Sequence, residues 1–250
     1  MNNTESLKLM LKSLHLSSFQ EHYQSFARQA ESEELSFEQY LKTLVEQEVH
    51  DRAERRITRL LKRACLPEGK SLDTLDQKLL PVKVRRQISA LCNGGFIERA
   101  ENVLVFGLPG RGKTHLVAAV ARELVLNNSQ PVFFINTRKL VERLLIAKQN
   151  LELEKELKKL DKFVCIILDD IGYVQQSREE MEVLFAFLSE RYERRSIMIT
   201  SNLVFSEWDK IFKDAMTTAA AIDRLVHHSV ILELNNKSYR ADYAKQKIRK

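Results

Sequence analysis

Residues 107–114 combine three glycines, a lysine and a threonine at a spacing that suits phosphate binding. The segment reads Gly107-Leu108-Pro109-Gly110-Arg111-Gly112-Lys113-Thr114 and matches the pattern G-x-x-x-x-G-K-[ST]. An apolar run precedes it and a helical pattern follows, so we expect a loop between a strand and a helix. Glycines let backbone N–H groups approach an anion closely, and the positive end of the helix dipole strengthens the attraction. A glycine-rich turn without a ligand is the alternative, and the complete pattern argues against it.

The polar groups of this loop are those that a magnesium nucleotide needs. We expect Lys113 to reach the β- and γ-phosphates and the Thr114 hydroxyl to contact Mg²⁺. ATP and Mg²⁺ are therefore the expected ligands. The predicted nucleotide contacts are Gly107, Leu108, Pro109, Gly110, Arg111, Gly112, Lys113, Thr114 and His115.

A second polar segment supplies the acid that a magnesium nucleotide requires. The run VCIILDD, residues 164–170, reads as a buried strand that ends in two carboxylates. Taken alone this pattern is weak, because Asp also favours the turn after a strand. Together with the loop it predicts that Asp169 holds Mg²⁺ through water and that Asp170 orients the attacking water.

Two further residues have the chemistry to assist phosphoryl transfer. Asn202 follows the strand-like run IMITS and is predicted to bind the γ-phosphate or the attacking water; a turn residue is the alternative. Arg224 precedes the last apolar run and is predicted to stabilise charge on the transferred phosphoryl group. Arginines in this role raise rates by roughly 10³ to 10⁵. A helix-surface arginine paired with Asp223 is the alternative.

Strands and helices must position these groups, and the pattern changes near residue 100. The first hundred residues read as helical, with a capping box at Ser36 and Gln39 that opens a long helix ending before Pro67. Five strand-length apolar runs then alternate with helical segments, at residues 103–106, 132–135, 163–168, 196–200 and 229–234. We predict an α/β fold in which a five-stranded parallel sheet has helices on both faces. A small helical domain, residues 1–70, would precede this domain, residues 71–250.

Charge is unevenly distributed along this chain of 250 residues, which has a formal net charge of +6. Residues 1–50 hold four Lys or Arg against eight Asp or Glu, whereas residues 51–100 hold twelve against six. A clustered positive surface is typical of nucleic-acid binding, because phosphate neutralisation releases counterions. The candidate DNA contacts are Arg52, Arg55, Arg56, Arg59, Lys62 and Arg63. The segment 137–162 is a second candidate, and a merely solvated helix face is the alternative.

Other sequence features favour a cytoplasmic protein. No apolar run approaches the roughly 20 residues of a membrane span, and no cationic start precedes an apolar block. The three cysteines are odd in number and far apart, which predicts buried, unpaired thiols. We expect a cytoplasmic location and no membrane partner.

Several motifs together resemble a known family. The stretches are GLPGRGKTHL, FIERAENVLVFG, ILDDIGY, LSERYERRSIMITSNLVFSEW, AAAIDRLVHH and SYR. They resemble the IstB-like ATPases, transposition helper proteins of bacterial insertion sequences that are similar to DnaC-type helicase loaders. The likeness spans about residues 35 to 245. It implies an AAA+ P-loop NTPase core with a helical N-terminal domain, nucleotide-dependent homo-oligomers on DNA, and cooperation with a transposase.

The resemblance also implies roles for single residues. Asn202 corresponds to sensor 1, on a strand between those that carry the two phosphate-site motifs. Arg224 corresponds to a finger inserted into a neighbouring subunit's site, and Arg240 of SYR either contacts nucleotide or packs. Asp170 stands where many relatives have Glu, so we expect slow hydrolysis that rises on assembly with DNA.

The sequence leaves four functions to compare. The first is an ATP-dependent DNA-binding ATPase that assists a transposase in target selection and integration. A DnaC-like loader of a replicative helicase is the alternative, and the acidic first 50 residues suit a protein partner in either. A small-molecule kinase has no need of Asn202 or Arg224, and the sequence has no obvious lid. A nucleotide-gated scaffold would tolerate the loss of Asp170.

Overall fold

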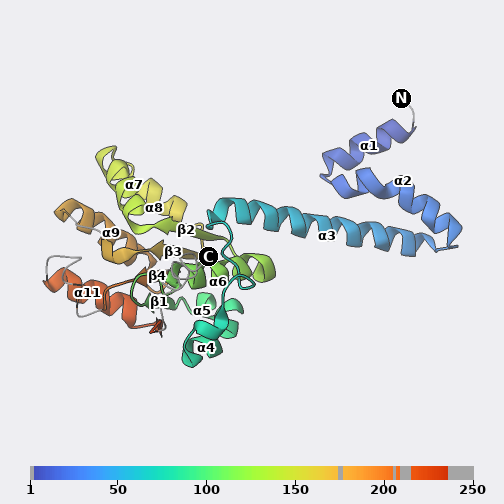
Figure 1. Cartoon of the computed structure of the whole chain (residues 1–250). Coiled ribbons are helices and arrows are strands. Elements are labelled where there is room, and N and C mark those ends of the chain that lie inside the picture. The colour runs from blue at the N-terminus through green and yellow to red at the C-terminus, as the bar shows by residue number, and fades with distance from the viewer. Residues whose placement is uncertain (1–2, 174–176, 205–206, 209–214, 236–250) are drawn as a thin grey trace, which may run out of the picture. The chain divides into compact units, whose positions relative to one another are not determined.

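The computed structural model describes residues 3–173, 177–204, 207–208 and 215–235. The chain divides into two compact units, residues 1–59 and 60–250, and their boundary lies within one helix (Figure 1). Among the described residues of the first unit, the only regular secondary structure is helical. The second unit contains the sheet.

Three helices make up the first unit: α1 (Asn3–Ser13), α2 (Ser17–Ser32) and the part of α3 (Phe37–Ala64) up to residue 59. The predicted capping box is confirmed, because the Ser36 amide donates to Gln39 Oε1 at 2.8 Å and the Gln39 amide donates to Ser36 Oγ at 3.2 Å. These bonds satisfy amides at the start of α3 that have no partner within the helix. The long helix predicted to end before Pro67 is confirmed as well.

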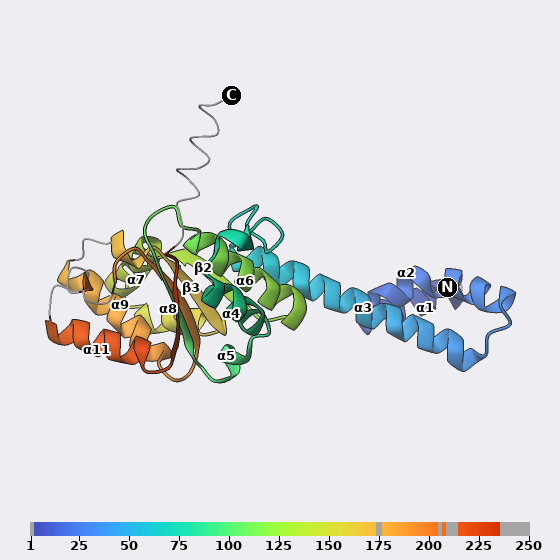
Figure 2. The ribbon, with the colours of Figure 1, turned by 60° about the horizontal axis from the view of Figure 1, so that its bottom comes forward.

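A buried carboxylate holds this unit together. Glu48 is 4% exposed and accepts hydrogen bonds from the Ser18 amide at 2.8 Å and from Arg52 Nε at 2.6 Å. Arg55 Nη2 lies 3.3 Å from the same carboxylate, and Arg52 Nη2 donates to the His15 carbonyl at 2.8 Å. Glu48 therefore fastens α3 to the first turn of α2, Arg52 fastens α3 to the turn between α1 and α2, and α1 packs on α2 (Figures 1 and 2).

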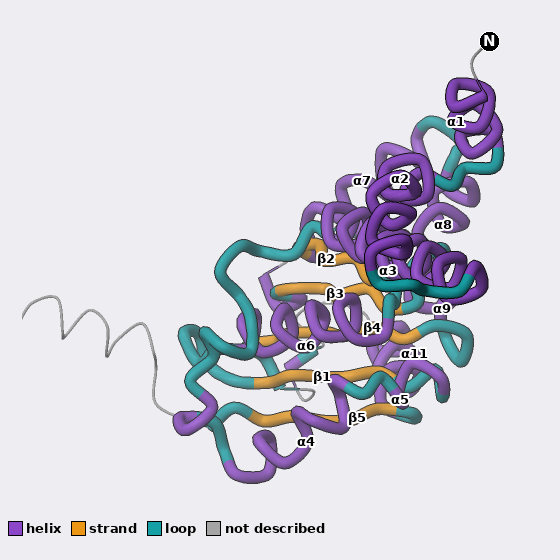
Figure 3. The backbone as a smooth tube through the Cα atoms, turned by 90° about the vertical axis from the view of Figure 1, so that its right-hand side faces the viewer, coloured by secondary structure: helices purple, strands orange, loops and turns teal. Residues whose placement is uncertain are grey.

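The second unit is built on a five-stranded sheet, as the sequence predicts. Its strands are β1 (Asn102–Phe106), β2 (Val132–Asn136), β3 (Cys165–Asp169), β4 (Ser196–Ser201) and β5 (Ser229–Glu233). All neighbouring pairs are parallel, and the order is β2-β3-β4-β1-β5 (Figure 3). Strand β4 thus lies between β1 and β3, as the family resemblance implies.

Helices cover both faces of this sheet, which confirms the predicted layers. On one face α6 (Lys113–Asn128) packs on the strands and against α4 (Val82–Cys92), which contacts the short α5 (Gly95–Glu98). On the other face lie α7 (Thr137–Gln149), α9 (Arg178–Arg191) and α11 (Ala215–Val226), and α8 (Leu153–Leu160) packs on α7 (Figure 3). Two 3-10 turns complete the described elements, η1 (Gln77–Leu79) and η2 (Ile171–Tyr173).

Alternation along the strands assigns their side chains to the two faces. Leu104, Ile166 and Ile199 belong to the core formed with α7, α9 and α11. Their strand neighbours Val103 and Ile167 are also fully buried, because side chains alternate between faces. Burial of such a side chain contributes about 1.5–3 kcal/mol, so these strands are a rigid support for whatever follows their ends.

Two other expectations concern membranes and thiols. None of the helices within the described residues is long and apolar enough to cross a membrane. All three cysteines are unpaired, and burial raises the pKa of Cys165 to about 12 and that of Cys92 to about 11. Cys65 is exposed, so the expectation of a buried thiol was wrong there, because it follows the last turn of α3.

The Glu48 contacts predict acid-sensitive stability of the first unit. Burial disfavours the charged carboxylate, but hydrogen bonds from Arg52 and from the Ser18 and Phe19 amides outweigh it and lower the pKa of Glu48. This contribution is therefore present above the unfolded-state pKa of about 4.3 and is lost as the pH falls through the folded-state value. Glu48→Gln should cost about 1–3 kcal/mol at neutral pH. Hydrogen exchange of the Ser18 amide should report the loss, and a cost that stays constant down to low pH would contradict the assignment.

Candidate nucleotide-binding site

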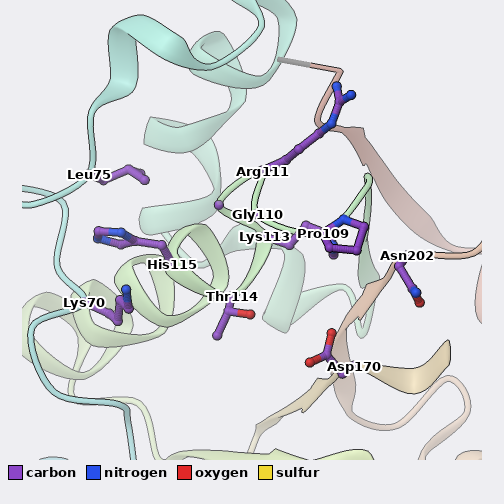
Figure 4. A pocket seen from close by; sticks show the side chains of 11 residues that line it. Lys70, Leu75, Pro109, Gly110, Arg111, Lys113, Thr114, His115, Asp170 and Asn202 are labelled. Carbon is purple, nitrogen blue, oxygen red and sulfur yellow. The ribbon is translucent and has the colours of Figure 1, made fainter. Parts of the chain in front are cut away.

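A cavity lies where β1, β3 and β4 end, and its volume is about 210 Å³. Because parallel strands end at the same edge of a sheet, residues far apart in sequence meet there. The cavity brings together the loop after β1, Asp170 after β3 and Asn202 after β4 (Figure 4). The lining residues are Lys70, Leu75, Pro109, Gly110, Arg111, Gly112, Lys113, Thr114, His115, Asp170 and Asn202.

The loop folds around its lysine. Lys113 is 6% exposed, and its Nζ donates to the Gly107 carbonyl at 2.6 Å and to the Leu108 carbonyl at 3.2 Å. Gly107 and Leu108, predicted as nucleotide contacts, thus orient Lys113 and are not among the lining residues of the described cavity. Gly112 has a φ of +89° immediately before α6, a conformation that favours glycine. The loop therefore turns directly into the positive end of α6.

The predicted metal residues are in contact with each other. Thr114 Oγ1 donates to Asp169 Oδ1 at 2.9 Å, and Asp169 is 8% exposed at the end of β3. Magnesium prefers oxygen ligands and is commonly bound through one or two carboxylates together with phosphates. A hydroxyl and a carboxylate within hydrogen-bond distance, beside a glycine loop and a lysine, fit a magnesium nucleotide.

Thr200 links the two acids and was not predicted from the sequence. This fully buried residue of β4 donates from Oγ1 to Asp169 Oδ1 at 2.7 Å and accepts from the Asp170 amide at 2.9 Å. Asp170 has a φ of +60°, in the left-handed region. Backbone strain of this kind is common at functional sites, where surrounding contacts hold the strained residue in place. Here the hydrogen bond to Thr200 is one of those contacts.

Asn202 lies beside the chain that follows the acids. Its Oδ1 is buried and has no hydrogen-bond partner among the described residues, and the side chain lines the cavity. A Cβ on Gly172 would lie 2.2 Å from that oxygen, so only glycine leaves room for this position of Asn202. An unpaired buried acceptor costs free energy, so the position of this oxygen is an unusual one among buried polar groups.

Comparisons with known proteins agree with this geometry. Residues 9–247 match the family described as IstB-like ATP binding protein. The chain belongs to this family. It is 43% identical to a putative insertion sequence ATP-binding protein of Sinorhizobium fredii over 94% of this chain and 78% of that one. It is 38% identical to the insertion sequence IS21 putative ATP-binding protein of Pseudomonas aeruginosa over 96% and 89%.

Solved structures show the fold of this IstB-like protein. A crystal structure of the DnaC helicase loader has a TM-score of 0.59 and 19% identity, and the match covers 67% of this chain and 98% of that one. Identity at this level supports the fold alone. The likeness confirms the α/β fold predicted from the sequence.

One wall of the cavity in this IstB-like protein comes from residues that the sequence did not indicate. Lys70 and Leu75 lie on one side, with His115, while Asp170 and Asn202 lie on the other (Figure 4). His115 Nε2 lies 3.1 Å from the Ser71 carbonyl, so this nitrogen carries a proton. It also lies 3.0 Å from Thr74 Oγ1. Burial lowers the pKa of His115 and so favours the neutral ring.

A second contact holds the same wall, since Arg122 Nε donates to the Lys70 carbonyl at 3.3 Å. Residues 70–75 lie in a polar segment that carries no motif, so no pattern could place them in the cavity. Another missed group had a usable pattern: Asn136 ends β2 and Thr137 follows it, much as Asn202 follows β4. Thr137 Oγ1 donates to the Asp169 carbonyl at 3.0 Å and Asn136 Nδ2 donates to it at 3.4 Å.

Arg224 lies outside the lining of the described cavity. Its Nη1 donates to Ser189 Oγ at 2.8 Å, and its guanidinium lies 4.5 Å from the centre of the Phe185 ring. Both partners belong to α9 rather than to the phosphate loop. Arg240 lies outside the described residues.

The predicted DNA contacts on α3 divide into two groups. Arg52 and Arg55 bind Glu48 within the first unit, and the Arg63 guanidinium lies 5.5 Å from the centre of the Phe163 ring in the second. All six residues are exposed, and three of them take no part in these contacts: Arg56, Arg59 and Lys62.

The two bonds of Thr200 predict a measurable cost of removing its hydroxyl. Thr200→Val keeps the shape but leaves the partly buried Asp170 amide without this acceptor and Asp169 without one donor, at a cost of about 1–3 kcal/mol. Thr200→Ser retains the hydroxyl and serves as the control. Thermal unfolding should show a melting temperature several degrees lower for the Val variant alone. Equal melting of all three proteins would show that these bonds do not hold the site.

Proposed function

We propose that this IstB-like protein is a magnesium-dependent ATPase that assembles as a homo-oligomer on DNA and assists a partner transposase in target selection and integration. The observation that supports it most directly is the connected set of Thr114, Asp169, Thr200 and Asp170 beside the phosphate loop. Simple phosphate binding needs only the loop. The second acid and the Asn202 amide, which lines the cavity, are groups that hydrolysis uses.

The residues of the chain divide the work of hydrolysis. Amides of the loop and Lys113 would hold the phosphates, and Thr114 and Asp169 would hold Mg²⁺. When bound, the ion neutralises charge on the phosphate oxygens. Asp170 would orient the attacking water and accept its proton, and Asn202 would fix the water or the γ-phosphate. Because Asp is one methylene shorter than Glu, its reach to the water differs, and we propose a slow basal rate.

Leu75 and Lys70 suit the other end of the nucleotide. With the phosphates on the loop, the base and ribose would lie toward the wall formed by Lys70, Leu75 and His115. Leu75 offers an apolar surface for a purine ring, and Lys70 offers a cation near the ribose and phosphates.

Topology gives a physical reason for assembly. The Leu225 carbonyl, next to Arg224, accepts a hydrogen bond from Asn102 Nδ2 at the first residue of β1. The phosphate loop begins after the last residue of β1, and five strand residues span roughly 16 Å. Arg224 thus lies near the amino-terminal ends of the strands, whereas the phosphate loop of the same chain follows their carboxyl-terminal ends. We propose that it completes the site of a neighbouring copy.

Relatives favour a transposition helper over a helicase loader. Two relatives at 43% and 38% identity are named as insertion sequence ATP-binding proteins, whereas the DnaC loader at 19% identity shows the fold alone. Integration assays with a transposase from the same element would test this choice, with ATP-dependent target use as the supporting result. Loading of a replicative helicase instead would contradict it.

Lys113→Ala tests the nucleotide site. Removal of the ammonium should weaken ATP binding by about 100-fold, because charge-assisted hydrogen bonds contribute about 1.5–3 kcal/mol each. Asp170→Asn is the matched control, since it should retain ATP affinity and lose turnover. Calorimetry and phosphate release measure the two effects. Unchanged ATP uptake by the Lys113 variant would reject the site.

Exposed arginines on α3 test the DNA surface. Arg56→Gln together with Arg59→Gln should weaken DNA binding and reduce the slope of log K against log salt by about 0.9 for each lost phosphate contact. These two residues are preferred to Arg55, whose loss would also break the Glu48 contacts. Arg28→Gln, an exposed arginine of α2, is the control. An unchanged slope in the double variant would exclude this surface.

A further inference from the structure

Helix α9 connects the acids of one site with the arginine proposed for another. In chain order Asp169 and Asp170 are followed by η2 and then by α9, which packs on α11 in the same unit. A capping box at Ser177 and Glu180 fixes the start of α9. Two residues further along this helix contact the side chain of Arg224.

These contacts restrict the guanidinium in two different ways. The ring of Phe185 lies under it at 4.5 Å, which is well within the range at which a cation is attracted to a ring face. The Ser189 hydroxyl, one turn later, accepts from Nη1 at 2.8 Å. The guanidinium is thus held at two points, by the ring near its central carbon and by the hydroxyl at one nitrogen. An arginine with one of these contacts alone would be less restricted.

Arg224 is also anchored through its backbone. Leu225, the next residue, is 2% exposed, and its carbonyl accepts from Asn102 at 3.3 Å. Asn102 Oδ1 accepts in turn from the Ile197 amide at 3.0 Å, so β1 and β4 both hold the last turn of α11. The main chain at Arg224 is therefore fixed by the sheet, and the side chain by α9.

We propose that Phe185 and Ser189 are positioning residues that orient the Arg224 guanidinium toward the nucleotide site of a neighbouring copy. This inference rests on the proposed function, in which Arg224 acts in that site. The reason is pre-organisation: a long side chain that is ordered before assembly loses less freedom when it enters the neighbour's site. A misplacement of about 1 Å in such a group can cost about 10²-fold in rate. Phe185 and Ser189 thus act through Arg224 and do not touch the nucleotide of their own site.

Two substitutions separate these positioning contacts from folding. Phe185→Leu keeps an apolar side chain and removes the ring face, and Ser189→Ala removes the hydroxyl with little change in volume. Met181→Leu is the matched control, because Met181 lies one turn before Phe185 on α9 and packs on the same core. Thermal unfolding of each variant shows whether it is folded. If the Phe185 variant does not fold, the Ser189 variant carries the test.

The main measurement is turnover per subunit as a function of protein concentration, with DNA present and ATP affinity measured in parallel. We expect both variants to bind ATP within about twofold of the wild type, while the turnover reached at high concentration falls about tenfold. Arg224→Ala is the reference, with a larger fall of roughly 10³-fold. Met181→Leu should behave as the wild type.

Mixing two variants provides a readout that a structural defect would not give. Asp170→Asn subunits are inactive but carry an intact Arg224, whereas Phe185→Leu subunits carry an intact nucleotide site. If Phe185 acts only through Arg224, mixtures should exceed the activity of either protein alone, because an Asp170 variant supplies a well-placed arginine to a Phe185 variant. Failure of the mixture to exceed both parents would overturn the inference.

The outcomes also distinguish this inference from the proposed function. Wild-type turnover in the Phe185 and Ser189 variants, with Arg224→Ala inactive, would reject the positioning role and leave the ATPase intact. Faster turnover in the Ser189 variant would also reject the positioning role, because the Ser189 contact would then hold Arg224 away from the neighbouring site. Wild-type turnover in Arg224→Ala would reject Arg224 as a catalytic group, and failure of the wild type to bind ATP would reject the function itself.

Discussion

The bridge that Thr200 forms between Asp169 and Asp170 is the interaction on which the site depends. One hydroxyl donates to the carboxylate of the first acid and accepts from the amide of the second. The bond to the Asp170 amide holds that residue in its left-handed conformation. The Asp169 carboxylate accepts from Thr200 at Oδ1 and from Thr114 at both oxygens. Because Thr200 belongs to β4 and the acids to β3, the bridge requires both strands to end at the same level.

Sheet register provides that level. Leu168 pairs with Ile199, and β4 also pairs with β1, where Phe106 lies opposite Ser201. A shift of one residue in either pair would turn Thr200 toward the other face of the sheet and separate it from both acids. The apolar residues of β1, β3 and β4 are buried between helices. A shift in register would therefore lose much of the free energy that their burial contributes. Packing in the core therefore determines hydrogen bonding at the edge.

Sequence patterns predict the parts of this site that are local in the chain. The phosphate loop, the two acids and the five strands each have a short-range pattern, and so does the Ser36 capping box. Thr200 has none, because its partners lie about 30 residues away and are set by strand order. Lys70 and Leu75 are missed for the same reason: contacts of His115 and Arg122 bring their segment to the cavity. The contacts of Glu48 with Ser18 and of Arg52 with His15 likewise join residues that are distant in sequence. The basic residues of α3 therefore read as one surface, although Arg52 and Arg55 also bind Glu48.

Close packing couples the position of Asn202 to the position of the two acids. Gly172 follows Asp170 by two residues, and its missing side chain is the space that the Asn202 amide occupies. Any displacement of the chain after β3 must therefore move Asn202 as well, because protein interiors have few voids that could absorb the change. The same chain continues through η2 toward α9, whose residues hold Arg224. The groups proposed to contact the nucleotide in one copy and the groups proposed to act in the next copy are thus carried by one continuous stretch of backbone, which would directly connect successive sites in the proposed assembly.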